Sequence, residues 1–553
     1  MPRAGIVSRT GCLITALATA FAARRVGATQ QAPDLLLVGG KVFTSDTTRP
    51  WAEAVAIRGE QIVAVGTTAD VRRLAGPLTR VIDVGGRVVV PGFNDAHDHI
   101  LAGSPGTNVS MGGPEVDAAG DQVLDSVRAV TGRVAPGTWI RVEIWAKAFD
   151  DTTLRRPALD RAAPAHPVVI YAGWGHGMIV NTAAMRALGI RDTEPDPLGG
   201  WYERERQGRL TGRLYEYAGW SARRRHRALV PESTMIDNLR RFAQRELQLG
   251  ITTVQDVGLN YAPATQMRVL RAARLPIRVH VYKHSIPSAS SLNIAEWEGL
   301  PERPAPLVVV SGRKWILDGA PPGLDGLMFT RGPQAGRPGW HGRFDFPIDS
   351  VRRMLADAVQ RREQLALHVL GDSAVAIVVR LMETVAPDSV WRPLRVRFEH
   401  GGILGTPDLW ARAAAKGVMI VANLQLIPDA RTLPRAFLDS LTSDFGPAVM
   451  SRFPLGLGSD GIARSPFAGL ASALRFPYDP RPSREFLVRA YTWGSAYAEL
   501  AESQKGSLAP GMLADIAVLS QDIFTVPVEV PARTESMLTL VGGRVAWDAG
   551  VLR

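Results

Sequence analysis

Eight short apolar segments, separated by stretches with helical periodicity, constrain the fold of this chain more than any other feature of its sequence. Each segment has the length and β-branched content of a buried strand. The segments are residues 88–99, 250–258, 276–284, 307–319, 365–372, 394–401, 417–425 and 455–461. Eight strands alternating with helices are typical of a closed (β/α)8 TIM barrel, so we expect that α/β fold. Between strands, Ser350 and Ser373 are placed to cap helices.

Both ends of the chain carry a different, strand-rich pattern. Residues 34–90 and 506–553 contain alternating runs broken by glycine, such as AVAIRGEQIVAVG and SMLTLVGGRVAW. We expect the two ends to form one small β-sandwich, which leaves residues 91–505 for the barrel. Far more residues separate the first two barrel strands than one crossover needs. We therefore expect an insertion after barrel strand 1, at about residues 105–245.

Residues 1–28 have the layout of a secretory signal peptide. Arg3 and Arg9 precede an apolar run, and small residues follow it. The run is too short to span a bilayer. We expect an exported protein, periplasmic or secreted, with no integral membrane segment after signal removal; a cytoplasmic enzyme with an N-terminal extension is the alternative. Cys12 is the only cysteine, so cleavage of this segment excludes disulfides, thiolate ligands and a cysteine nucleophile.

The charge pattern bears on the class of partner. The formal net charge is +11, and the densest basic cluster is RRRHR at residues 223–227. Such a cluster favours a solvated helix face over contact with an anionic surface. No basic stripe is interleaved with aromatic residues, so we expect a small-molecule substrate and no nucleic acid. The sequence leaves a homodimer open.

Six residues stand where a barrel enzyme places its chemistry. His97 and His99 end the first strand, and the period of two in a strand puts both imidazoles on one face, where they can chelate a metal. His368, His400 and Asp460 lie near the carboxyl ends of later strands, and Lys314 lies in the fourth. Singly, these residues have other readings: core histidines, a lysine paired with Asp318, a helix cap. Together, imidazoles and a carboxylate favour a divalent metal such as Zn²⁺.

Six segments of the chain also occur in a familiar order: PGFNDAHDH, KWILDG, LHVLGD, RFEH, GLGSDG and GSLAPGMLADIAVL. They resemble the motifs of the amidohydrolase superfamily and, within it, of the amidohydrolase-3 group, which includes YtcJ-like proteins and N-substituted formamide deformylases. In the insertion, GWGHGMIVNTAAMRALGI and GRLTGRLYE resemble two further stretches of that group. Two departures are Gly175, where an acidic residue is usual, and Arg209-Leu210, which replaces x-Pro.

The resemblance implies a set of roles. His97 and His99 would bind the more buried of one or two metal ions, and His368 and His400 the second. Lys314, carboxylated on its amine, would bridge them, and Asp460 would complete the ligand set and act as proton shuttle. Candidate substrate contacts are His176, Asn181, Trp174 and Asp318; a structural hydrogen bond for His176 and plain packing for Trp174 are the alternatives.

The expected reaction follows from this chemistry. Zn²⁺ lowers the pKa of bound water to near 7, so metal-activated hydroxide could cleave a non-peptide carbon–nitrogen bond of an amide, N-acyl or N-formyl compound. Asp460 would pass the proton to the leaving nitrogen. The alternatives are a deaminase or cyclic-amide hydrolase on the same scaffold and a non-catalytic barrel protein. The last predicts loss of metal ligands, and none of the six is missing.

Overall fold

The computed structural model describes residues 31–101, 103–112, 116–319, 342–400, 406–426, 453–461, 464–476 and 481–552. Residues 1–28 and Cys12 lie outside this set, so the signal peptide and export stay predictions. No helix within the described ranges is both long and apolar enough to cross a bilayer.

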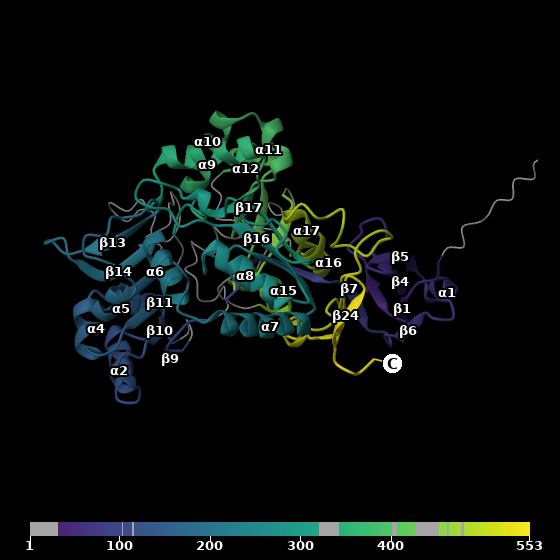
Figure 1. Ribbon diagram of the computed structural model, residues 1–553. Helices are drawn as coiled ribbons and strands as arrows, with labels where there is room; N and C mark the ends of the chain where they lie inside the picture. The colour runs from purple at the N-terminus through teal and green to yellow at the C-terminus, as the bar shows by residue number, and fades with distance from the viewer. Residues whose placement is uncertain are drawn as a thin grey trace, which may run out of the picture.

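A sheet of eight parallel strands forms the centre of the molecule, as expected (Figure 1). Its first and last strands lie side by side, and the Asp460 N–H donates to the His97 carbonyl oxygen at 2.7 Å. This confirms the (β/α)8 barrel. In order around the sheet, the strands are β8 (Phe93–Asp98), β15 (Ile251–Asp256), β16 (Arg278–Lys283), β17 (Val308–Ile316), β18 (Leu365–His368), β19 (Arg397–Glu399), β20 (Met419–Ala422) and β21 (Leu455–Leu457).

The first predicted strand, residues 88–99, is divided between two sheets. Residues Val88–Pro91 form β7 in the terminal β domain, and the barrel strand β8 begins at Phe93. Gly92 lies at the junction, and a Cβ there would meet Thr252 Oγ1 at 2.2 Å. The apolar run continues through both strands, which is why the sequence pattern merges them.

Helices surround the barrel and pack on it with one apolar face. In α9 (Ile348–Arg361), Val351, Met354, Leu355 and Ala358 are buried at helical spacing. Within the described residues, the other helices of the barrel region are α7 (Glu232–Gln248), α8 (Pro263–Ala273), α10 (Asp372–Val385), α11 (Asp388–Leu394), α12 (Pro407–Ala415), α15 (Pro466–Arg475), α16 (Arg484–Arg489) and α17 (Ser495–Ala498).

The two predicted serine caps are wrong by two residues or more. The N-cap of α9 is Pro347, whose ring fixes a suitable φ, and Ser350 lies inside the helix. The N-cap of α10 is Gly371. Its N–H donates to Asp318 Oδ2 at 2.7 Å, and this tertiary contact fixes where the chain turns into the helix.

Both ends of the chain build the additional β domain. One sheet has the order β5-β4-β1-β6 and the other β24-β23-β22-β7-β2-β3, so N- and C-terminal strands share the second sheet. A buried apolar cluster that includes Leu37, Val89 and Leu538 joins them. The strands are β1 (Leu35–Val38), β2 (Lys41–Phe43), β3 (Trp51–Ala52), β4 (Ala54–Arg58), β5 (Gln61–Gly66), β6 (Arg80–Asp83), β22 (Ile516–Leu519), β23 (Ser536–Val541) and β24 (Arg544–Asp548), with helix α1 (Thr68–Arg72) beside them.

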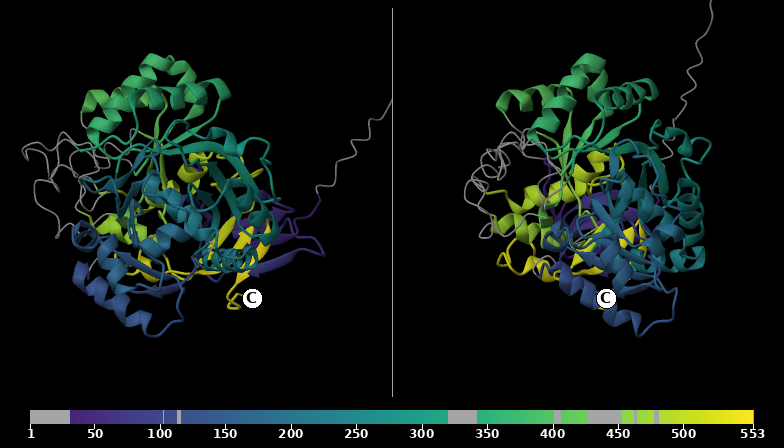
Figure 2. Two further views of the ribbon diagram at one scale, coloured as in Figure 1. Left: turned by 60° about the vertical axis from the view of Figure 1, so that its left-hand side comes forward. Right: turned by 90° about the vertical axis from the view of Figure 1, so that its left-hand side faces the viewer.

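The insertion forms a second module on the side of the barrel away from the terminal β domain (Figures 1 and 2). Its six-stranded sheet has the order β13-β14-β12-β11-β10-β9. Helix α7 falls within the predicted insertion range but packs on α8 and β15, so we place it with the barrel. The insertion elements are β9 (Thr107–Val109), α2 (Gly120–Thr131), β10 (Ile140–Ile144), α3 (Ala146–Asp150), α4 (Arg156–Ala162), β11 (Val168–Ala172), β12 (Gly177–Val180), α5 (Thr182–Ala187), β13 (Gly200–Arg204), β14 (Leu210–Glu216) and α6 (Tyr217–Arg227).

Candidate metal centre

A cavity of about 490 Å³ lies at the carboxyl ends of the barrel strands, between the barrel and the insertion. This is the end where (β/α)8 enzymes hold their active sites. All six predicted metal ligands line it: His97, His99, Lys314, His368, His400 and Asp460. The structure thus brings together side chains from β8, β17 and β18 and from the segments that follow β8, β19 and β21.

His97, His99 and Asp460 form the tightest group. Asp460 Oδ1 lies 2.9 Å from His99 Nε2 and 3.3 Å from His97 Nε2. One ligand atom from each residue lies within 4.8 Å of the others, which suits a single metal ion. Asp460 has a φ of 56°, a left-handed conformation that is costly for a residue with a Cβ and is concentrated at functional sites.

A buried carboxylate orients His97 from behind. His97 Nδ1 donates to Glu399 Oε2 at 2.5 Å, and Arg397 Nε donates to Glu399 Oε1 at 2.7 Å. Burial by itself would raise the pKa of Glu399, but Arg397 and His97 hold it below its usual range. The ionised carboxylate fixes the proton on Nδ1 and leaves Nε2 free to bind a metal.

His368 and His400 lie beside this group. The His400 ring centroid is 4.7 Å from that of His97 and 4.5 Å from that of His368. Burial lowers the pKa of both residues, that of His400 to about 3, so both imidazoles are neutral, the form that binds metals. His400 Nδ1 donates to Asn423 Oδ1 at 2.8 Å. His368 Nε2 lies 3.3 Å from the Gly319 carbonyl oxygen, so binding a metal through Nε2 requires this contact to break.

Lys314 is buried, and its Nζ has no hydrogen-bond partner among the described residues. Burial lowers its pKa to about 8. The pairing of Lys314 with Asp318 that the sequence left open is absent from the described residues, because Asp318 instead accepts hydrogen bonds from the N–H groups of Leu370 and Gly371. A buried polar atom without a partner is unfavourable, so Lys314 Nζ indicates that this centre is completed by another group.

The predicted substrate contacts divide into two kinds. His176 and Trp174 line the cavity; His176 Nδ1 donates to Glu216 Oε2 at 2.8 Å, and its ring centroid lies 4.8 Å from that of His368. Asn181 and Asp318 are not among the lining residues. The Asn181 side chain caps α5 and bonds to the backbone of Val168 and His166, so the structure gives it a local structural role.

The basic cluster at residues 223–227 is not the solvated helix face that its composition predicts. His226 and Arg227 are buried, and Arg223 and Arg227 line the cavity. They are four residues apart on α6, so both lie on one face of the helix. The sequence showed the density of charge, but it held no sign of what packs against this face.

Comparison with known proteins gives relatives that extend over nearly the whole chain. The chain is 26% identical to "Protein LONG AFTER FAR-RED 3" of Arabidopsis thaliana, over 92% of this chain and 91% of that protein. It is 27% identical to N-substituted formamide deformylase of Arthrobacter pascens, over 89% of this chain and 94% of that protein. An uncharacterized metal-dependent hydrolase from Pyrococcus horikoshii has the same fold, with a TM-score of 0.67, 19% identity and coverage of 90% of this chain and 99% of that one.

The amidohydrolase-3 family model, described as the amidohydrolase family, matches residues 80–546. That range contains the whole barrel, the insertion and nearly all of the C-terminal strands. The chain therefore belongs to the amidohydrolase family and is a hydrolase.

Proposed function

We propose that this enzyme cleaves a non-peptide amide, an N-acyl or N-formyl amine, at a centre that holds Zn²⁺. One observation carries the proposal: six side chains of suitable chemistry, from five parts of the barrel, line a single cavity. The name of the Arthrobacter relative, an N-substituted formamide deformylase, favours the N-formyl class.

The residues present fit one or two divalent ions. His97, His99 and Asp460 would hold the first, His368 and His400 the second, with Lys314 between them. Neutral imidazoles and one carboxylate form a donor set that Zn²⁺ accepts readily. When bound, the metal supplies an activated water near neutral pH and polarises the scissile carbonyl.

Lys314 fits such a centre only after modification. An ammonium group between two cations would be repelled, whereas a carbamate is an anionic oxygen ligand. The neutral amine forms a bond to the carbon of CO₂ and loses a proton. The lowered pKa of Lys314 increases the neutral fraction, and its unpartnered Nζ leaves room for the new group.

Asp460 is placed to move the proton. Burial opposes its ionisation, but the neighbouring His97 and His99 imidazoles hold the pKa of Asp460 well below its usual value. The carboxylate is therefore ionised at neutral pH and can accept a proton from the attacking water. It can then donate that proton to the departing nitrogen, which leaves as an amine.

The test combines metal analysis with product analysis. Protein reconstituted with Zn²⁺ is assayed by mass spectrometry for metal content and with a panel of N-acyl, N-formyl and cyclic amides. We expect stoichiometric metal and equal amounts of amine and carboxylate, and a loss of about 10²- to 10⁴-fold in kcat for Asp460→Asn. Ammonia without a carboxylate product would point to deamination instead. Full activity in Asp460→Asn would remove the shuttle role.

A further inference from the structure

We propose that the substrate carries an anionic group, a carboxylate, and that Arg227 with Arg223 binds it on the α6 wall of the cavity. This inference rests on the proposed function, because it names the substrate class of the same site. It comes from the charges on the cavity wall outside the metal centre. Among the described residues, those with charged side chains there are Arg141, Arg223, Arg227, Arg241, Arg245 and a single acid, Glu143.

Arg227 is the residue on which the proposal depends most. Its side chain is 4% exposed, and its Nε and Nη1 have no hydrogen-bond partner among the described residues. No carboxylate in the described part of the chain pairs with it. A buried guanidinium without a partner is strongly unfavourable, whereas one that meets a carboxylate gains charge-assisted hydrogen bonds. The cavity that Arg227 lines is where such a carboxylate can enter.

The surroundings of Arg227 hold it in place without neutralising it. The Tyr171 ring lies 5.7 Å from the Arg227 guanidinium and 4.6 Å from that of Arg223, so one ring supports both cations. The Tyr171 hydroxyl is 2.6 Å from His226 Nδ1. Burial, with Arg227 and Arg141, lowers the pKa of His226 to about 3, so His226 is neutral and adds no charge at this position.

Trp220 connects this wall to the metal centre. The Arg223 guanidinium lies 5.6 Å from the Trp220 ring centroid, and that ring is 6.3 Å from His99 and 5.7 Å from His176. An apolar surface therefore lies between the cationic wall and the site of hydrolysis. A matching substrate has its amide at one end, an apolar segment beside Trp220, and a carboxylate at the other end.

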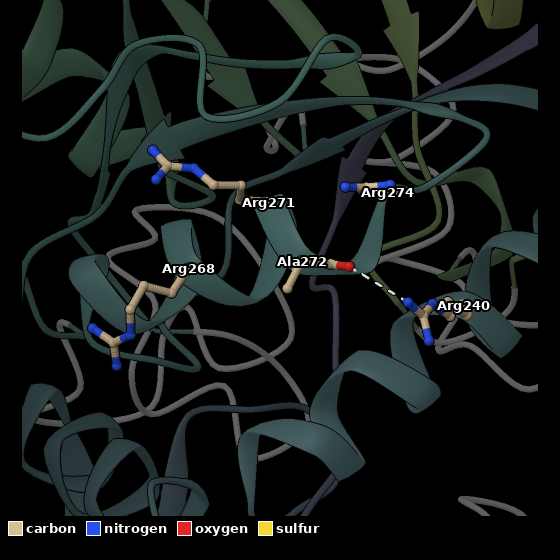
Figure 3. Close-up of a pocket in the computed structure, with 5 residues that line it drawn as sticks. All are labelled: Arg240, Arg268, Arg271, Ala272 and Arg274. Carbon is tan, nitrogen blue, oxygen red and sulfur yellow. Dashed lines mark hydrogen bonds between the residues drawn. The ribbon is translucent and has the colours of Figure 1, made fainter.

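A second arginine-rich cavity, of about 440 Å³, does not have these properties. Arg240 and Arg271 donate to backbone carbonyl oxygens, and Arg268 pairs with Glu232 at 2.6 Å. Figure 3 shows the guanidinium groups of Arg240, Arg268 and Arg271 extending apart instead of toward one point. These three cations have partners already, so none of them is left to bind an anionic ligand.

The experiment compares acids with their esters in three variants. The substrates are N-formyl and N-acetyl para-aminomethylbenzoate and their methyl esters. Arg227→Met and Arg223→Gln remove the proposed contacts. Arg225→Met removes a charge from the same helix outside the cavity, where Arg225 pairs with Glu194 at 3.1 Å. Binding of para-toluate, measured by calorimetry, reports on the carboxylate site without turnover.

We expect the wild type to prefer the acids, and Arg227→Met to lose about 10- to 100-fold in kcat/KM for them, through KM, with a much smaller change for the esters. Para-toluate binding should weaken by a similar factor in Arg227→Met and stay unchanged in Arg225→Met. If Arg227→Met does not fold, Arg223→Gln, whose partly exposed side chain tolerates change better, carries the same comparison.

The outcomes separate the two proposals. Hydrolysis of acids and esters at equal rates, with no effect of Arg227→Met or Arg223→Gln, would overturn the inference and leave the proposed function intact. Para-toluate binding that depends on Arg227, without hydrolysis of any amide, would uphold the anion site and overturn the proposed function.

Discussion

Glu399 Oε2 lies 2.5 Å from Nδ1 of His97, and both side chains are buried. Arg397 keeps the Glu399 carboxylate ionised from the opposite side. A metal ligand whose second nitrogen bonds to a carboxylate is fixed in ring orientation and made more basic. In the proposed metal centre, Glu399 is therefore a positioning residue, although it need not touch metal or substrate.

Glu399→Gln should weaken metal binding by about 10- to 100-fold, because the amide can hold the ring but does not increase its basicity. Chelator competition measures the affinity. The matched control is Glu363→Gln, which removes a buried carboxylate paired with Arg313 at 3.0 Å, away from the cavity. Equal metal affinity in Glu399→Gln and wild type would contradict the role assigned to Glu399.

Two glycines on and beside β21 provide a test of how the barrel closes. A Cβ on Gly458 would lie 2.4 Å from the His97 backbone nitrogen, whereas a Cβ on Gly456 would have its closest contact, at 3.4 Å, with Ala498 Cβ. Gly458→Ala should lower the free energy of unfolding by about 1–3 kcal/mol and weaken metal binding, since His97 must shift. Gly456→Ala should have little effect. Urea denaturation of both variants checks this, and equal midpoints would refute it.

Lys314 should carry a carbamate in the metal-loaded enzyme. Protein prepared with ¹³C-labelled bicarbonate should give a carbamate signal in the NMR spectrum that is absent from Lys314→Met. Lys505, buried but bonded to Glu499 at 2.8 Å and Thr253 at 3.0 Å, is the control lysine and should stay unmodified. A signal that persists in Lys314→Met would place the modification elsewhere.

Glu499 gives the stability of the barrel a defined dependence on pH. Lys505 Nζ lies 2.8 Å from one carboxylate oxygen and His280 Nδ1 3.1 Å from the other. Burial alone would raise the pKa of Glu499, but these neighbours lower it to about 2, from an ordinary value of 4.5. Because the folded-state pKa is depressed, the stabilisation is complete above about pH 4.5 and is lost as the pH falls toward about 2.

Glu499→Gln should therefore lower the free energy of unfolding at pH 7 by about 3 kcal/mol relative to wild type, which a lower urea midpoint would show. This difference should shrink as the pH approaches about 2. Glu502→Gln, which removes a partly exposed partner of Arg395, should cost less than about 1 kcal/mol. The measurements use metal-free protein, because protonation of metal ligands at low pH would add a second pH dependence to the free energy of unfolding. A difference that is independent of pH would exclude this explanation.

The barrel could be predicted because each of its strands is recognisable from the local sequence alone. Buried parallel strands are near-continuous apolar runs, and each of the eight predicted segments contains one barrel strand. The six predicted ligands lie at one cavity for the same reason: parallel strands end on one face of a barrel, so position along the strand predicts position in space.

Contacts between elements could not be predicted in this way. The sequence places Glu399 next to His400 in RFEH. It could not predict the bond from His97 to Glu399, because the two residues lie on different strands of the barrel. Nothing in the sequence indicated that Asn423 accepts a hydrogen bond from His400. Arg227 looked like a surface residue because its burial comes from the insertion sheet, and the break at Gly92 is invisible where two buried strands follow each other.

The hydrogen bond from the Asp460 N–H to the His97 carbonyl oxygen joins the first and last ligands along the chain. A chain that ends before β21 already contains His97, His99, His368, His400 and Lys314, but it lacks Asp460, which the proposed first metal site needs. That proposed site is therefore complete only once the last barrel strand has docked beside the first and closed the barrel.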